Sequence, residues 1–367
     1  MNRMHGIIFA YGKCSSLQTL VEQRVADSIP YAARYRIIDF MLSNMVNAGV
    51  TDIGVVLQDK YQSMLDHLGS GKDWDLSRKH GGLRLLPAVP KSDPGRCFRG
   101  KMEALAAIES YVQRIRQEYV VLANGALICN MPLDDVLEEH IRSGADITCV
   151  CTPRRVTEEA TTYMVDESGA ITDVLSRRGT VGGYSALEVY LVSKKLLLQL
   201  IAECDGHNEY SFHRAVLQDM KGQLKLHAYV FNRYAARIMS LADYYERSME
   251  LLDGRVRAEL FLPERPIRTK DRSDPSTYYG AESRCVNSLV SDGCIIEGDV
   301  ENSILFRGVR VEKGAKISGC ILMQDTVIRT GALLKCAIAD KNVTVTEGRT
   351  LMGHTSYPLA ISKFSVV

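Results

Sequence analysis

A seventeen-residue repeat in the last third of the chain constrains the fold more than any other feature of the sequence. Glycines recur at this interval, at Gly314, Gly331 and Gly348, and so do isoleucines, at Ile304, Ile321 and Ile338. Within each repeat apolar residues stand six apart, as in the two series Leu305, Val311, Ile317 and Leu322, Ile328, Leu334. A six-residue beat inside a coil of about eighteen residues is typical of a β-helix, whose inward side chains stack from coil to coil. A β-sandwich would alternate with a period of two and would not show the seventeen-residue echo.

The chain before about residue 253 follows another pattern, in which strand-like and helix-like segments alternate. Strands are expected at residues 4–10, 52–57, 119–123 and 145–152, and helices at residues 36–49, 102–116 and 133–143. This alternation predicts an α/β domain with a mostly parallel sheet and helices on both faces. The ligand crevice of such a sheet lies at the carboxyl ends of its strands, which directs attention to residues 11–30 and 124–131.

The two patterns predict three parts along the chain. Residues 1–253 are expected to form the α/β domain, residues 254–284 a linker, and residues 285–367 the β-helix. The linker is expected because this stretch holds Pro263, Pro266 and Pro275 and has little periodicity.

Charge and composition exclude several classes of protein. The 367 residues include 45 Lys and Arg against 44 Asp and Glu, so no nucleic-acid partner held by a strong overall field is expected. No apolar run approaches the roughly 20 residues of a membrane-spanning helix, so no membrane partner is expected either. The ten cysteines contain no C-x-x-C pair, which favours reduced, buried thiols in a cytoplasmic protein over a structural zinc site.

Two stretches near the N-terminus carry candidate phosphate contacts. The loop after the first strand, Tyr11-Gly12-Lys13-Cys14, holds a single glycine and is a weak phosphate cradle. Arg34 and Arg36 would stand at the start of the next helix, where the dipole favours anions rather than cations. With Lys13 and Arg24 they are candidate contacts for a sugar phosphate or another phosphorylated effector, and a solvated basic face is the alternative.

Several longer motifs carry a family resemblance. They are Tyr35-Arg36-Ile37-Ile38-Asp39-Phe40, Trp74-Asp75-Leu76 with Arg78, Gly81-Gly82-Leu83 with Leu85-Leu86-Pro87, and Tyr244-Tyr245-Glu246. Over nearly its whole length the chain thereby resembles the sugar-nucleotide pyrophosphorylases, and specifically ADP-glucose pyrophosphorylase (glucose-1-phosphate adenylyltransferase). The resemblance implies a Rossmann-like nucleotidyltransferase domain followed by a C-terminal left-handed parallel β-helix. It also implies a reaction in which ATP and glucose 1-phosphate give ADP-glucose and pyrophosphate with the help of Mg²⁺.

The positions that this family uses for chemistry are altered in this chain. An overlay on the family's glycine-rich loop leaves Ala10, Tyr11 and Gly12 as equivalents of its nucleotide site, and Gly100 is a further equivalent in the stretch Phe98-Arg99-Gly100-Lys101. Ser16 takes the place of the loop arginine and Ala26 that of the following lysine.

The family's two metal-binding aspartates fall on Gly125 and His213. Mg²⁺ prefers carboxylate oxygens, which a glycine cannot supply and a histidine supplies poorly. Loss of one group that stabilises a transition state commonly costs a factor of about 10²–10³ in rate, so loss of the whole set should leave almost no turnover. We therefore assign no catalytic residue and no metal ligand to this chain.

These losses, read with the resemblance, imply a non-catalytic or weakly active regulatory subunit in glycogen biosynthesis. Its expected partner is a catalytic ADP-glucose pyrophosphorylase subunit in a mixed oligomer, expected to be a tetramer, with self-association also open. Mg²⁺ is expected in that catalytic partner, and no cofactor is expected in this chain. The alternative is a chain that makes ADP-glucose itself, for which Asp39, Asp73 and Asp75 are available acids. A third interpretation, an acyltransferase built on the β-helix, would use His354, the only histidine beyond the linker.

Overall fold

The computed structural model describes residues 3–11, 15–91, 93, 95–156, 161–176 and 182–367. The chain forms two compact units that interleave along the sequence. Unit 1 comprises Met1–Gly12, Ile38–Arg237 and Leu262–Arg268, and unit 2 comprises Lys13–Ile37, Ile238–Phe261 and Thr269–Val367. The division of the chain at residues 253 and 284 stays a prediction.

Unit 1 is built on a nine-stranded sheet of order β10-β9-β11-β6-β1-β4-β5, in which β8 pairs with β11 and β12 pairs with β8. Its strands are β1 (Met4–Ala10), β4 (Asp52–Leu57), β5 (Gly82–Pro87), β6 (Tyr119–Asn124), β8 (Ile147–Thr152), β9 (Thr162–Val165), β10 (Ile171–Leu175), β11 (Tyr184–Ser193) and β12 (Leu226–Val230). Strand β1 runs parallel to β4 and β6, and β4 runs parallel to β5. The expected mostly parallel sheet is confirmed, and the antiparallel strand β11 is its main departure.

Helices cover both faces of this sheet, as the alternation of segments predicts. On one face, α3 (Lys101–Ala107), α4 (Glu109–Gln113) and α6 (Lys194–Gly206) share a core with Ile7 and Phe9 of β1. On the other face lies α1 (Ile38–Asn47), so close to β1 that a Cβ on Gly6 would come within 2.4 Å of the Met45 sulfur. The prediction of one helix over residues 102–116 is wrong, because the chain leaves helical geometry at Ile108 (φ −108°, ψ 17°).

The remaining elements of unit 1 connect and extend the sheet. They are α2 (Gln62–Leu68), η3 (Lys72–Trp74), β7 (Leu127–Cys129), α5 (Leu133–Ser143), η4 (Phe212–Gln218) and β13 (Ala235–Arg237). Helix α5 lies where it was expected and contacts β8 and β12. Within the described residues, no helix combines the length and apolar character that crossing a bilayer demands.

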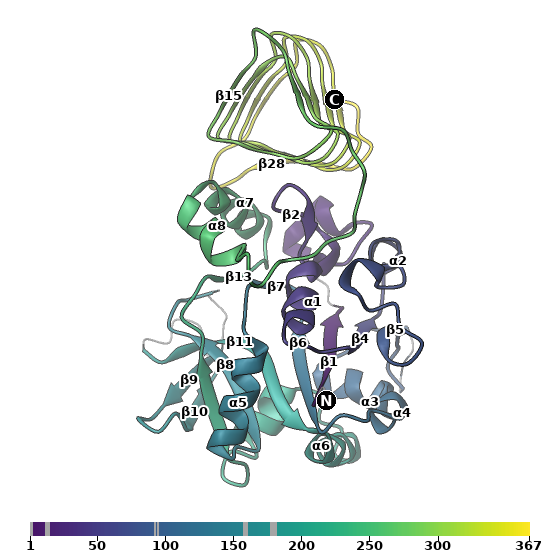
Figure 1. Cartoon of the computed structure of the whole chain (residues 1–367), viewed down its shortest axis with the longest axis vertical. Helices are drawn as coiled ribbons and strands as arrows, with labels where there is room; N and C mark the ends of the chain where they lie inside the picture. The colour runs from purple at the N-terminus through teal and green to yellow at the C-terminus, as the bar shows by residue number, and fades with distance from the viewer. Residues whose placement is uncertain (1–2, 12–14, 92, 94, 157–160, 177–181) are drawn as a thin grey trace. The chain divides into compact units, whose positions relative to one another are not determined.

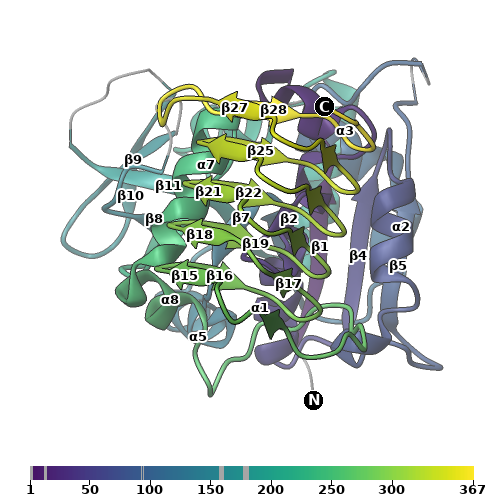
Figure 2. The same cartoon turned by 90° about the horizontal axis from the view of Figure 1, so that it is seen from above.

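The β-helix in unit 2 has the period read from the sequence. Three parallel five-stranded sheets form the sides of a triangular coil, which Figure 1 shows end on and Figure 2 shows as stacked rungs. Ile304 pairs with Ile321 and Ile321 with Ile338, in register. Gly314, Gly331 and Gly348 have φ values of 71°, 68° and 66°, which explains why glycine recurs there. This arrangement is consistent with the predicted left-handed β-helix.

The strands of the coil are two or three residues long. The first sheet holds β14 (Tyr278–Tyr279), β17 (Ile295–Ile296), β20 (Arg310–Val311), β23 (Val327–Ile328) and β26 (Thr344–Val345). The second holds β15 (Arg284–Val286), β18 (Asp299–Glu301), β21 (Lys316–Ser318), β24 (Leu333–Lys335) and β27 (Thr350–Met352). The third holds β16 (Leu289–Val290), β19 (Ile304–Leu305), β22 (Ile321–Leu322), β25 (Ala337–Ala339) and β28 (Leu359–Ile361).

Unit 2 also contains segments from outside the coil. They include η1 (Ser15–Val21), η2 (Ala26–Ser28), the hairpin of β2 (Pro30–Tyr31) and β3 (Tyr35–Arg36), α7 (Leu241–Met249), η5 (Glu250–Leu252) and α8 (Gly254–Leu260). The Tyr244 hydroxyl of α7 donates to the Pro30 carbonyl (2.8 Å), and the Tyr245 hydroxyl donates to the Gly319 carbonyl (2.8 Å). The prediction that Arg34 and Arg36 begin a helix is wrong: Arg36 lies in the hairpin and the helix starts at Ile38.

Candidate functional site

The carboxyl ends of β1 and β6 lie side by side in unit 1 and form the floor of the predicted crevice. Phe9 of β1 is in register with Asn124 of β6, and the Gly125 amide donates to the Phe9 carbonyl (3.0 Å). Ala10 is fully buried, and Tyr11 is half-buried with its hydroxyl donating to the Gly100 carbonyl (3.3 Å). Three of the sequence-predicted residues of unit 1, Tyr11, Gly100 and Gly125, therefore meet at this edge.

Gly100 allows a further segment to approach the crevice. A Cβ at this position would stand 2.2 Å from the Tyr210 carbonyl oxygen, and the Met102 amide donates to the same oxygen (3.0 Å). Only a residue without a side chain allows this approach. The contact brings the start of η4, with His213, beside the start of α3.

The centre of the crevice is a cluster of charged side chains that the motifs did not reveal. Glu188 of β11 is paired with Lys101 of α3 and, at 2.7 Å, with Arg237 of β13. It also accepts a hydrogen bond from the side-chain amide of Asn124 (3.3 Å). The three charged side chains are between 10% and 24% exposed. Burial alone would raise the pKa of Glu188, but the charges of Lys101 and Arg237 outweigh burial and hold that pKa well below its usual range.

His213 lies within the electrostatic reach of this cluster. Burial lowers the pKa of the His213 imidazole. Two smaller effects act on the same pKa: the charge of Glu188 raises it and the charge of Lys101 lowers it. Its Nε2 atom is buried and has no hydrogen-bond partner among the described residues. An imidazole does not replace a carboxylate as a ligand for Mg²⁺.

A second carboxylate near the crevice is also held by cations. Glu103 of α3 is paired with Arg96 and Arg99 and accepts a hydrogen bond from the Arg99 amide (2.7 Å). Burial would raise the pKa of Glu103, but these partners lower it to about 2. In the described parts of the chain, no three His, Cys, Asp or Glu side chains are grouped so that they could hold a metal ion. The donor set at this edge of the sheet does not fit Mg²⁺.

The other sequence-predicted site residues belong to unit 2 or lie outside the described residues. Ser16 lies exposed in η1, and Ala26 lies buried in η2. Gly12 and Lys13 fall outside the part of the chain that the structure describes.

Two of the predicted effector contacts meet around one lysine of the β-helix. Arg24 is buried and paired with buried Asp340, and its Nη1 atom is buried without a hydrogen-bond partner in the described parts of the chain. Burial lowers the pKa of Lys341 to about 7, and the charges of Arg36 and Arg24 add to that shift. Lys363 contributes in the same sense. We call Arg24, Arg36, Lys341 and Lys363 the basic cluster.

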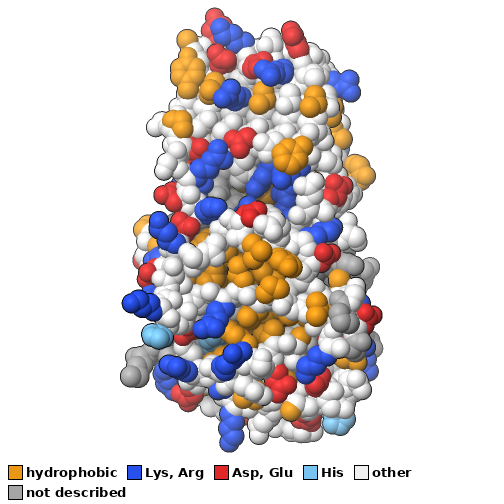
Figure 3. All heavy atoms as spheres, turned by 90° about the vertical axis from the view of Figure 1, so that its right-hand side faces the viewer, with side chains coloured by type: hydrophobic (Ala, Val, Ile, Leu, Met, Phe, Trp, Pro, Cys, Tyr) orange, Lys and Arg blue, Asp and Glu red, His pale blue; other side chains and the backbone are white. Residues whose placement is uncertain are grey.

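Arg34, the remaining predicted contact, is exposed and lies near a different cation. Burial lowers the pKa of the Arg307 guanidinium, and the charge of Arg34 is the next largest cause. Arg307 donates to the Lys270 carbonyl (3.3 Å). Figure 3 shows Lys and Arg side chains distributed over both the upper and the lower half of one face of the molecule.

The residues considered for the alternative functions have other surroundings. Asp39 is fully buried and paired with His67 at 2.5 Å, while exposed Asp75 is paired with Arg78 at 2.6 Å. Asp73 lies half-buried in η3. His354 is exposed in the last coil, with its Nδ1 atom 2.8 Å from the Ser356 hydroxyl.

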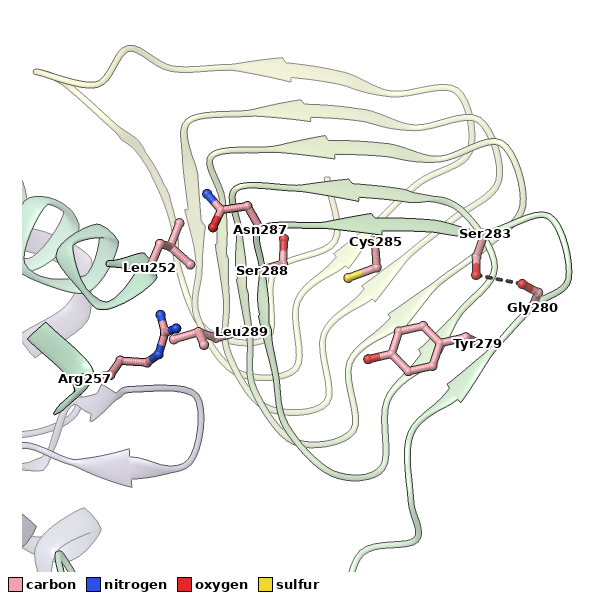
Figure 4. Close-up of a pocket in the computed structure, with 9 residues that line it drawn as sticks. All are labelled: Leu252, Arg257, Tyr279, Gly280, Ser283, Cys285, Asn287, Ser288 and Leu289. Carbon is pink, nitrogen blue, oxygen red and sulfur yellow. Dashed lines mark hydrogen bonds between the residues drawn. The ribbon is translucent and has the colours of Figure 1, made fainter. Parts of the chain in front are cut away.

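Unit 2 also has a hollow of about 600 Å³ beside the first coil (Figure 4). Its lining includes Arg257, Tyr279 and Cys285, and the Ser283 hydroxyl donates to the Gly280 carbonyl there (2.7 Å). None of the predicted site residues that the structure describes lines it.

The sequence contained one signal for the charged cluster that the motifs missed. Glu188 interrupts the otherwise apolar run Ala186-Leu187-Glu188-Val189-Tyr190. An ionisable residue inside a buried strand needs a partner, so its presence points to a hidden cation. The sequence does not identify that partner, because Lys101 and Arg237 stand 87 and 49 residues from Glu188 along the chain.

Two family models match the chain. A model described as nucleotidyl transferase matches residues 5–175, and one described as GlmU-like, C-terminal hexapeptide matches residues 276–356. These matches agree with the nucleotidyltransferase domain and the β-helix expected from the sequence.

Several known proteins are similar to this chain over most of its length. "Glycogen biosynthesis protein GlgD" of Geobacillus stearothermophilus is 39% identical over 86% of this chain and 83% of its own length. The protein of the same name from Bacillus subtilis (strain 168) is 37% identical over 99% of this chain and 96% of its own length. "Glucose-1-phosphate adenylyltransferase" of Clostridium perfringens (strain SM101 / Type A) is 30% identical over 88% of this chain and 84% of its own length. The chain therefore belongs to the glucose-1-phosphate adenylyltransferase (ADP-glucose pyrophosphorylase) family, in which it is similar to the proteins named GlgD.

Proposed function

We propose that this chain is a regulatory subunit of glucose-1-phosphate adenylyltransferase in glycogen biosynthesis and has almost no turnover of its own. It would assemble with a catalytic subunit that makes ADP-glucose from ATP and glucose 1-phosphate, with a mixed tetramer as the expected assembly. Mg²⁺ would be bound by the catalytic partner and not by this chain. The proposed location is the cytoplasm, in keeping with cysteines such as Cys149 and Cys151 that lie buried as free thiols.

One observation carries the non-catalytic part of this proposal. Two carboxylates at the crevice, Glu188 and Glu103, are each paired with two cations of the same chain. Gly125, which stands where the family's aspartate would be, has no side chain to offer. Phosphoryl transfer depends almost wholly on positioned charges and metal ions, so a crevice whose carboxylates Glu188 and Glu103 are paired with cations should not support it.

The basic cluster supports the regulatory part of the proposal. Four basic side chains lie around one buried carboxylate, Asp340, in a partly buried place, and the charges of Arg36 and Arg24 help to lower the pKa of Lys341. A phosphate group would offset this repulsion between basic side chains through charge-assisted hydrogen bonds. We propose that a sugar phosphate or another phosphorylated effector binds at the basic cluster.

Two measurements test the function. Pyrophosphate release by the purified chain with ATP, glucose 1-phosphate and Mg²⁺ should be at least about 10³-fold slower than that of a catalytic subunit. The chain should co-elute with the catalytic subunit from its own organism and change that subunit's maximal rate or effector dependence. Rapid synthesis by the chain alone would instead establish the alternative, an active nucleotidyltransferase.

A matched pair of variants tests the effector site in the mixed assembly. Lys341→Met should reduce the response to a phosphorylated effector, because it removes a cation from the basic cluster. Lys335→Met, on an exposed side chain of the same coil, should leave the response unchanged. Equal responses in the two variants would remove the basic cluster from the proposal.

A further inference from the structure

The backbone at Glu188 is held in an unusual conformation. Its φ is 55°, a region that residues with a side chain rarely adopt, and it stands at an irregularity where the register of β11 against β8 shifts. Such a conformation costs about 1 kcal/mol or more and persists where the surroundings impose it, often at functional positions. The strain turns an acidic side chain out of an apolar strand and into the crevice.

Three donors from three separate elements converge on that carboxylate. Lys101 comes from the first residue of α3, Asn124 from the last residue of β6, and Arg237 from the last residue of β13. The set carries two positive charges against the single negative charge of Glu188. Lys101 and Arg237 are at most 18% exposed, so neither would be stable there without an anion.

This donor set matches what a phosphoryl group requires. A guanidinium and an ammonium with an amide N–H make charge-assisted hydrogen bonds to phosphate oxygens as readily as to a carboxylate. The donors lie at the carboxyl ends of the central strands, where a sheet of this kind binds its ligands. Half-buried Tyr11, edge-on to Phe98 at 5.0 Å between ring centroids, adds an apolar side to the same place.

We infer that Lys101, Asn124 and Arg237 form a phosphoryl-binding site whose anion position is occupied by the chain's own Glu188 carboxylate. The crevice is thus closed by an internal anion, in addition to lacking metal ligands. A phosphate ester or polyphosphate can enter only if Glu188 leaves. This inference does not depend on the regulatory role proposed above, because it concerns binding within unit 1 and not turnover or assembly.

Glu188→Gly tests the inference, with pyrophosphate as the probe and isothermal titration calorimetry as the measurement. Glycine adopts a φ of 55° at little cost, and its substitution removes the carboxylate. The variant should bind pyrophosphate at least tenfold more tightly than the wild-type chain, or with one additional site. Glu188→Gly combined with Lys101→Met should lose that gain, whereas pyrophosphate held by the basic cluster of unit 2 would persist in both.

Further variants separate binding from damage to the fold. Glu188→Gln removes the charge but keeps the bulk of the side chain in the site, so it should gain less affinity for pyrophosphate than Glu188→Gly. If Glu188→Gly and Glu188→Ala fail to fold in plain buffer, pyrophosphate should restore their folding, because it replaces the missing anion. Folded variants without any gain, a gain that survives Lys101→Met, or no rescue by pyrophosphate would each overturn the inference. All three results leave the measurement of turnover, and so the proposed function, unaffected.

Discussion

Arg24 and Asp340 form an ion pair that is almost completely enclosed, with side chains 4% and 0% exposed. The amide of Lys341 also donates to the Asp340 carboxylate (2.7 Å), so the acid is well satisfied. Removing one partner of a buried pair leaves an uncompensated charge and commonly costs about 3–5 kcal/mol. Asp340→Leu should therefore lower the free energy of unfolding by roughly this amount in urea denaturation.

The double variant Arg24→Met/Asp340→Leu is the control for that prediction. With both charges gone, no buried charge is left unpaired, so the loss should be smaller than for Asp340→Leu alone. A double variant at least as unstable as the single one would show that packing, and not charge pairing, accounts for the loss.

The lowered pKa of Lys341 predicts that anion binding at the basic cluster depends on pH. Its pKa of about 7 in the free chain leaves the amine mostly neutral at pH 8. A bound anion favours the charged form and raises this pKa, so binding at pH 8 should take up close to one proton and weaken as pH rises above 7. Sulfate, which does not titrate in this range, is the probe for calorimetry in buffers of different ionisation enthalpy.

Lys341→Met is the matched control for proton uptake. Arg24 and Arg36 keep their charges across this range, so the variant should bind sulfate more weakly and without the uptake. Sulfate binding by the wild-type chain that is equal at pH 6.5 and pH 9 would contradict the prediction.

At the scale of the element, the isoleucine series of the β-helix has a role that periodicity alone does not reveal. Leu305 and Leu322 belong to the core inside the coil. Ile304 and Ile321 precede them in two-residue strands and so point outward, yet both are fully buried. Segments outside the coil therefore cover this side of it.

A matched pair of variants tests whether this side of the coil is covered by other segments. Ile321→Ser should cost about 2–5 kcal/mol of unfolding free energy, the range for removing a large buried aliphatic side chain. Val327→Ser changes an outward residue at the same place in a strand of another sheet, where it is only half-buried, and should cost less than about 1 kcal/mol. If thermal or urea unfolding showed the same loss of stability for both variants, the side of the coil that holds Ile321 would be no better covered than the side that holds Val327.

Elements with a strong period were predictable from the sequence, and charged partners were not. The residues of β1, β4 and α5 follow from local apolar patterns, and the coil follows from its seventeen-residue repeat. The hairpin at Tyr31 and Tyr35 was not predicted, and Arg34 and Arg36 were instead expected at the start of a helix, because two-residue strands are too short to show alternation. The pairing of Glu188 with Arg237 depends on a fold that brings distant residues together, which one sequence does not specify.

At the scale of the whole molecule, the order of segments along the chain differs from their order in space. Residues 13–37 precede most of the α/β sheet in sequence, yet they belong to the same compact unit as the β-helix. Arg24 reaches Asp340 across 316 residues, and α7 binds both Pro30 and Gly319. The β-helix therefore completes a unit that begins near the N-terminus.

This interleaving predicts that the chain cannot be divided at residue 253 without loss. A fragment of residues 1–253 would keep Arg24 but lose Asp340, and it would expose the apolar side chains of residues 15–37 that unit 2 buries. It should therefore aggregate, or unfold at least several degrees below the full chain in a thermal scan. Co-expression with residues 254–367 should restore solubility, because the missing contacts can form between the two fragments. A fragment of residues 1–253 that is monomeric and as stable as the intact protein would show that the segment near the N-terminus does not need the coil.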